Sequence, residues 1–99
     1  MIKVEVTKKN ISILGHAMYN DYGKDIVCAS VSSIIMTSVE SIAAIDDKAI
    51  DIKQSKDKLE IIINKNDDIT KKLLTTMINL LHELEKKYPK NIKITNKEE

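Results

Sequence analysis

The stretch IVCASVSSIIMTSVESIAAI, residues 26–45, decides the fold of this chain. Its residues are apolar or small with serine and threonine between them, and the apolar ones recur at the i, i+3, i+4 spacing of a helix: Val27, Val31, Ile34 and Ile35. β-branched residues would permit a strand locally, but the length favours a helix, with Asp25 as a candidate N-cap. Because this helix is apolar on nearly all sides, we expect a sheet to cover one flank and a partner subunit the other.

Strands are predicted on both sides of this helix. Residues 2–6 alternate apolar and polar side chains, and a second alternation through Ile11 and Ile13 completes a predicted hairpin. Residues 15–24 hold both glycines of the chain without a sustained period, which indicates a loop. Beyond the helix, residues 50–53 and 59–63 are expected to pair as a second hairpin.

A second helix is predicted to begin at a cap formed by Asp67 or Asp68 and to end before Pro89. Its apolar stripe is expected to consist of Ile69, Leu73, Met77, Leu80, Leu81 and Leu84. A short last strand through Ile92 and Ile94 follows, and residues 96–99 are expected to form a frayed tail. The order β-β-α-β-β-α-β predicts an α+β fold, with two helices packed on one face of a mainly antiparallel sheet.

Length and composition limit where this chain can work. Its 99 residues suit one compact domain, residues 1–99, and 42% hydrophobic with 31% charged residues is typical of soluble globular proteins. The N-terminus, MIKVEVTKK, lacks the apolar run of a secretory signal, and a single cysteine agrees with a reducing compartment. We therefore expect a cytoplasmic protein without a membrane partner.

The charge pattern argues against direct nucleic acid binding. The net charge is only +1, and all 16 basic residues are lysine. The chain therefore lacks arginine, whose guanidinium group forms bidentate hydrogen bonds with phosphate and guanine. The three tyrosines, without any phenylalanine or tryptophan, are too few for a platform that stacks bases. An RNA-binding module is therefore the weakest of the function classes considered.

Two histidines and one cysteine carry the candidate chemistry. His82 falls among polar positions of the second predicted helix and is expected to be an ordinary solvated histidine. His16 follows a predicted strand and Cys28 lies in the first turn of the first helix, joined by a loop that allows them to meet. His16 and Cys28 alone are too few for a metal site built by the protein, since structural zinc needs four ligands and catalytic zinc about three, so no metal or other cofactor is expected.

The position of Cys28 would favour its thiolate. If Asp25 caps the helix, Cys28 is its third residue, where unpaired backbone N–H groups and the positive end of the helix dipole stabilise a negative charge. The same N–H groups would stabilise the oxyanion that forms when a thiolate attacks an amide. On spacing alone the alternative stays open that Cys28 is a small apolar core residue and His16 an ordinary residue at the end of a strand.

The stretch GHAMYNDYGKDIVCASVS, residues 15–32, resembles the signature of the ribosomal-processing cysteine protease family (Prp) of Firmicutes and related bacteria. The similarity covers Gly15-His16-Ala17, Tyr19, Gly23, Asp25-Ile26-Val27-Cys28-Ala29 and Val31-Ser32, and later Tyr88-Pro89 and Asn91-Ile92. Ser30 departs from it, since alanine is more usual there, and this small change leaves the pairing of His16 with Cys28 intact.

This resemblance implies a homodimeric α+β endopeptidase. Such an enzyme removes a short N-terminal extension from large-subunit ribosomal protein twenty-seven, cutting after an aromatic residue and before a small one. By the resemblance, Cys28 is the nucleophile and His16 its general base. The main rival from another class is a non-catalytic dimeric adaptor or ribosome-assembly factor in which Cys28 is inert.

Further residues of the loop have candidate roles with plain structural alternatives. Asp25 could orient the imidazole of His16, although a helix cap is its simpler role. The candidate substrate loop contains Ala17, Tyr19, Tyr22 and Gly23, with Gly23 as a possible hinge. The alternative for this loop is a surface connection whose tyrosines only pack.

Overall fold

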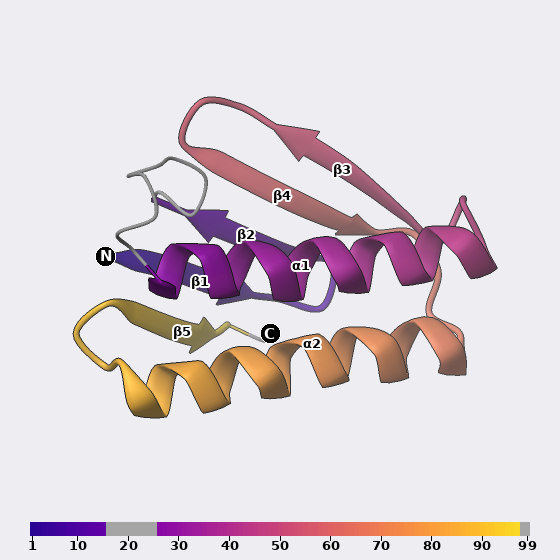
Figure 1. Cartoon of the computed structure of the whole chain (residues 1–99). Coiled ribbons are helices and arrows are strands. Elements are labelled where there is room, and N and C mark those ends of the chain that lie inside the picture. The colour runs from indigo at the N-terminus through magenta and orange to yellow at the C-terminus, as the bar shows by residue number, and fades with distance from the viewer. Residues whose placement is uncertain (16–25, 98–99) are drawn as a thin grey trace.

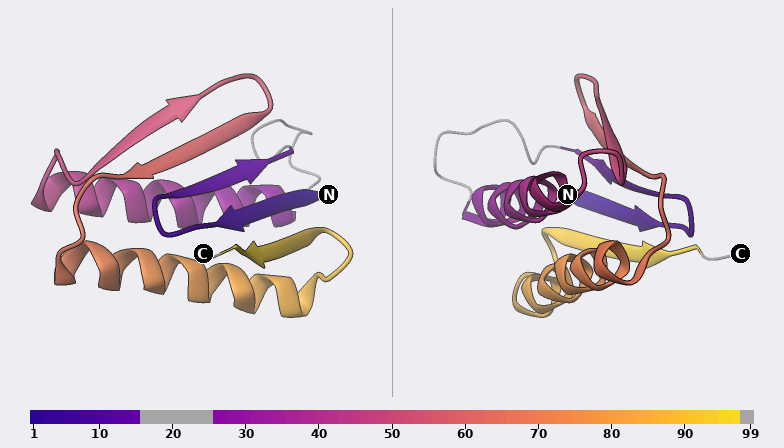
Figure 2. Two further views of the ribbon diagram at one scale, coloured as in Figure 1. Left: turned by 180° about the vertical axis from the view of Figure 1, so that it is seen from behind. Right: turned by 90° about the vertical axis from the view of Figure 1, so that its right-hand side faces the viewer.

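The computed structural model describes residues 1–15 and 26–97, which form strands and helices in the order expected from the sequence. The elements are β1 Ile2–Val6, β2 Asn10–Leu14, α1 Ile26–Ile45, β3 Ile50–Gln54, β4 Lys58–Ile63, α2 Asp68–Lys87 and β5 Ile92–Asn96. The predicted α+β architecture is confirmed, because both helices of the described chain lie on the same face of the sheet (Figures 1 and 2).

Within the described residues, the five strands form one sheet in the order β3-β4-β2-β1-β5. All neighbouring pairs are antiparallel except β1 and β5, which run parallel. The register aligns Val6 with Ile11, and Ile11 with Ile61. Since alternate strand residues face the same side, this alignment produces a continuous apolar row, and all three side chains are buried.

Helix α1 buries one stripe and leaves its opposite side exposed. Val27, Val31, Ile35 and Ile42 are buried in the common core. On the outer side Ile26 is 60% exposed and Met36 52%, so the sheet covers only one flank, and the cover expected on the other is not supplied by the described part of this chain. Although α1 is long and apolar enough to cross a membrane, the core helix of a soluble protein meets the same criteria.

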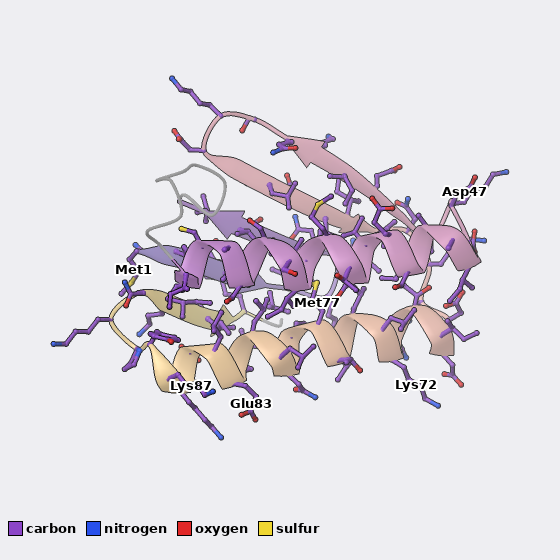
Figure 3. The ribbon with its side chains drawn as sticks, viewed as in Figure 1. Met1, Asp47, Lys72, Met77, Glu83 and Lys87 are labelled. Carbon is purple, nitrogen blue, oxygen red and sulfur yellow. The ribbon has the colours of Figure 1, made fainter. Side chains whose placement is uncertain are left out.

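Helix α2 begins at the predicted cap, where Asp67 Oδ1 accepts a hydrogen bond from Thr70 N at 2.9 Å. Its buried residues are Thr70, Leu74, Met77 and Leu81, so the predicted apolar stripe is wrong in part. Ile69 and Leu80, which we expected inside, are 52% and 46% exposed. The buried stripe is rotated because α2 packs against α1 and β5 together, and the side chain of Met77 points between the two helices whereas Lys72, Glu83 and Lys87 point outward (Figure 3).

The two edges of the sheet differ. The β3–β4 hairpin projects beyond the helices (Figure 2), which leaves most of β3 exposed, including Ile52 at 41%. Strand β5 continues through Asn96, which we had assigned to the tail, and Lys97 N donates to Val6 O at 2.6 Å. The parallel register aligns Val6 with Asn96, so β5 pairs with β1 along the whole length of β1.

Glu85 on α2 binds the outer side of β5. Its Oε2 accepts a hydrogen bond from Ile94 N, and its Oε1 lies 3.0 Å from His82 Nδ1. The Ile94 N–H group, and secondly His82, hold the pKa of Glu85 below its ordinary value, although partial burial opposes this shift. A backbone donor at a sheet edge is thereby paired within the chain.

Replacing Glu85 by Ala should lower the free energy of unfolding at neutral pH by about 1 kcal/mol, because Ile94 N loses its acceptor. The folded-state pKa of Glu85 lies below the ordinary value of 4.5, so this stabilisation is complete above that pH and is lost as the pH falls through the lowered pKa. Urea unfolding of wild type and variant across this range measures the difference. Glu83→Ala, at an exposed position of the same helix, is the control, and equal stability of Glu85→Ala and wild type at neutral pH would contradict the prediction.

Candidate active site

Cys28 is the third residue of α1 and lies in its first turn, as the sequence predicts. The buried stripe that holds this helix on the core starts at Val27, the residue before Cys28. The Cys28 side chain is half-buried and packs against the core cluster. The thiol is therefore held at the start of the helix by the packing of α1.

The start of a helix supplies what thiol chemistry needs. The N–H groups of its first turn have no acceptor within the helix, and together with the helix dipole they favour a nearby negative charge. A thiol in this position is one that a helix start can activate, and the same kind of N–H group serves oxyanion sites in general. A half-buried position also limits the water that would compete for both charges.

Gly15 turns the chain directly before His16. It follows the last residue of β2, has φ +98°, and its N–H donates to Asp57 O at 3.2 Å. A Cβ atom built on Gly15 would lie 2.7 Å from Met1 O, so a side chain has neither an allowed backbone conformation nor space here. We had treated Gly15 as one of several loop residues; a glycine directly after an alternating strand was the available signal for this positive φ.

The elements around Cys28 converge at one end of the molecule. The end of β2, the first turn of α1, the β3–β4 turn and the C-terminal end of α2 all lie at this end (Figures 1 and 2). The backbone hydrogen bond from Gly15 to Asp57 joins two of these elements. The fold therefore brings the residue that precedes His16 to the same end as Cys28.

The other predicted site residues lie outside the described residues. These are His16, Ala17, Tyr19, Tyr22, Gly23 and Asp25. Their proposed roles, including Asp25 as cap or orienting group and residues 17–24 as a substrate loop, therefore stay predictions. Among residues 1–15 and 26–97, no group of three or more His, Cys, Asp or Glu side chains could hold a metal ion.

In the described structure His82 contacts Glu85 and does not pair with Cys28. Its side chain is 45% exposed and contacts Glu85, which in turn binds Ile94 on β5. We expected a solvated histidine and did not foresee this link, because the sequence does not show that α2 passes beside β5. The contact of His82 with Glu85 accounts for this histidine without a catalytic role.

Comparisons with known proteins agree with this arrangement. The family model described as cysteine protease Prp matches residues 1–93. The ribosomal processing cysteine protease Prp of Staphylococcus aureus is 30% identical over 98% of this chain and 100% of its own length. Two crystal structures of the S. aureus protease are similar to the described fold: one, in complex with a covalently linked product peptide, has a TM-score of 0.88 at 30% identity, and one with a substrate peptide has 0.86 at 29%. Each covers 98% of this chain and 100% of the compared chain.

Fold, thiol position and these matches together make this chain a cysteine protease with an α+β architecture. It belongs to the cysteine protease Prp family.

Replacing Gly15 by Ala should lower the free energy of unfolding by more than about 1 kcal/mol, because alanine adds both an unfavourable φ and a clash with Met1 O. Chemical denaturation monitored by circular dichroism measures the change. Asn79→Ala, at an exposed position of α2, is the control and should change stability little. A Gly15→Ala protein as stable as wild type would show that the chain relaxes there at no cost.

Proposed function

We propose that this protease processes a ribosomal protein, with Cys28 as nucleophile and His16 as general base. The observation that carries the proposal is the position of Cys28 in the first turn of α1, in a chain that belongs to the Prp family. Further support comes from the S. aureus relative, which is named a ribosomal processing protease and has been crystallised with a substrate peptide and with a covalently linked product peptide. A covalent link between enzyme and peptide agrees with nucleophilic catalysis.

The proposed substrate is a short N-terminal extension of large-subunit ribosomal protein twenty-seven, cut after an aromatic residue and before a small one. This proposal rests on the resemblance of residues 15–32 to the family signature. Tyr19 and Tyr22 would line the pocket for the residue that precedes the cut. We place this reaction in the cytoplasm, where a single thiol stays reduced, and without a membrane partner.

The reaction would proceed by acyl transfer to sulfur. His16 accepts the Cys28 proton, and the sulfur then attacks the scissile carbonyl carbon to give a tetrahedral oxyanion. Backbone N–H groups at the start of α1 donate to this oxyanion. The imidazolium of His16 protonates the leaving amine as the C–N bond breaks, and water activated by His16 hydrolyses the thioester. Asp25 would orient the imidazole or cap α1, and no cofactor is required.

Cys28→Ala and His16→Ala should each abolish site-specific cleavage of a peptide that spans such an extension, as followed by mass spectrometry. The loss should exceed about a hundredfold, since each variant removes the nucleophile or its base. His82→Ala is the matched control because it removes the other histidine of the chain, and it should keep the activity. Full cleavage by either Cys28→Ala or His16→Ala would contradict the assignment.

Alkylation of the thiol separates the protease from a non-catalytic adaptor. An activated Cys28 should react rapidly with iodoacetamide at neutral pH, and His16→Ala should slow this reaction. A core cysteine without a role should react slowly and to the same extent in both proteins. Slow, unchanged labelling together with absent cleavage would favour the adaptor.

We propose further that the protease is a homodimer that uses the outer side of α1. Two apolar side chains on this side of the helix are largely exposed, Ile26 and Met36. Exposed apolar area of this kind is costly in water and is removed when a second subunit covers it. In such a dimer the second subunit would cover the exposed side of α1, as the apolar composition of residues 26–45 leads us to expect.

Met36→Glu should convert the dimer to a monomer, because it introduces an unpaired charge into an apolar contact. Light scattering coupled to size exclusion measures the mass of wild type and variant. Leu80→Glu places the same charge on an exposed apolar position of α2 and should leave the dimer intact. A monomeric wild type, or dissociation by Leu80→Glu alone, would contradict the proposed interface.

A further inference from the structure

A groove lies at the end of β1 opposite Met1 and away from the first turn of α1. The β1–β2 turn, the segment that follows β4 and the N-terminal half of α2 enclose it, and its volume is about 710 Å³. This is within the range of roughly 300 to 1,000 Å³ that is usual for ligand pockets. The catalytic elements converge at the other end of the sheet, so the proposed cleavage reaction does not explain this groove (Figure 1).

The rim of the groove is positive. Four lysines from three segments line it: Lys8, Lys9, Lys65 and Lys71. Among the described residues no Asp or Glu lines the groove, although acidic residues number 15 against 16 lysines in the whole chain. Lys65 shares its charge with Asp46 at 2.7 Å, whereas Lys8, Lys9 and Lys71 form no ion pair within the described residues. The groove therefore concentrates positive charge that the rest of the surface balances.

The floor of the groove is apolar. Ile63 and Ile78 are half-buried there, and Val6, Ile11 and Leu74 lie beneath them as part of the core. An occupant with apolar side chains would remove Ile63 and Ile78 from water as well as pairing with the lysines. A ligand that is only anionic would leave this part of the surface uncovered.

The lysines are presented on a fixed backbone. Thr7 Oγ1 accepts hydrogen bonds from Lys9 N at 3.2 Å and Asn10 N at 3.0 Å, and Lys9 O accepts one from Ile63 N at 2.9 Å. Asp67 caps α2, which fixes the turn of the helix that carries Lys71. Because these positions are set before a ligand arrives, less ordering opposes binding.

We propose that this lysine groove, lined by Lys8, Lys9, Lys65 and Lys71 around Ile63 and Ile78, docks a short acidic peptide segment with apolar side chains, carried by a partner protein. The apolar floor favours such a peptide over a nucleic acid, whose backbone would meet only the rim. Among the described residues no aromatic side chain lines the groove to stack a base, and lysine lacks the bidentate geometry that favours phosphate. The inference is independent of the proposed cleavage reaction.

Fluorescence anisotropy of the wild-type protein with labelled probes tests the proposal. The probes are a short peptide of glutamate and leucine, matched peptides with lysine for glutamate or serine for leucine, and an oligouridine. The glutamate–leucine peptide should bind at least about tenfold more tightly than each other probe. Added salt should weaken this binding without abolishing it, because the apolar contacts are not screened. This peptide has no aromatic residue and is not a substrate of the proposed reaction.

Charge reversal locates the binding site. Lys8→Glu combined with Lys71→Glu should weaken binding of the acidic peptide by about tenfold or more. The control combines Lys53→Glu with Lys90→Glu, which changes the net charge equally at exposed positions outside the groove, and it should retain most of the affinity. Equal loss in both double variants, preferential binding of the oligouridine, or no binding of the acidic peptide would each overturn the proposal.

Discussion

Burial of the α1 stripe in the common core is the constraint on which the rest of the structure depends. Val27, Val31, Ile35 and Ile42 hold this helix against the sheet, and Cys28 is adjacent to the first of them. A helix anchored along its length cannot shift its first turn without opening the core. The core thus fixes where a thiol meets the first turn and the dipole of a helix.

The sheet completes this arrangement through the central position of β1. This strand pairs with β2 on one side and with β5 on the other, so it links the N-terminal hairpin to the last strand of the chain. The residue before this strand also limits Gly15, because Met1 O occupies the space that a side chain would need. The backbone of Gly15 is therefore constrained by the start of the chain, which lies beside the end of β2.

Cys28 and the lysine groove lie at opposite ends of the sheet. One end combines the start of α1 with Gly15 and holds Cys28, the proposed nucleophile. The other end combines lysines with an apolar floor and suits recognition without reaction. Since charges exposed to salt interact weakly beyond roughly 10 Å, the lysines can act there with little influence on the thiol. A small protease can in this way hold a partner and a substrate at separate surfaces.

Residue patterns alone predicted the order of elements, the start of α1 and the place of Cys28 within it, because hydrophobic periodicity and turn residues act locally. They also limited the cap of α2 to Asp67 or Asp68, because capping is local, and the structure has Asp67 in this role. Only the tertiary structure decided which side of α2 is buried, that Ile69 and Leu80 remain exposed, and that Glu85 binds the edge of β5. It also decided that Gly15 meets Met1 and that four distant lysines line one groove. These features depend on how separate elements pack against each other, and periodicity within one element cannot specify the position of its neighbours.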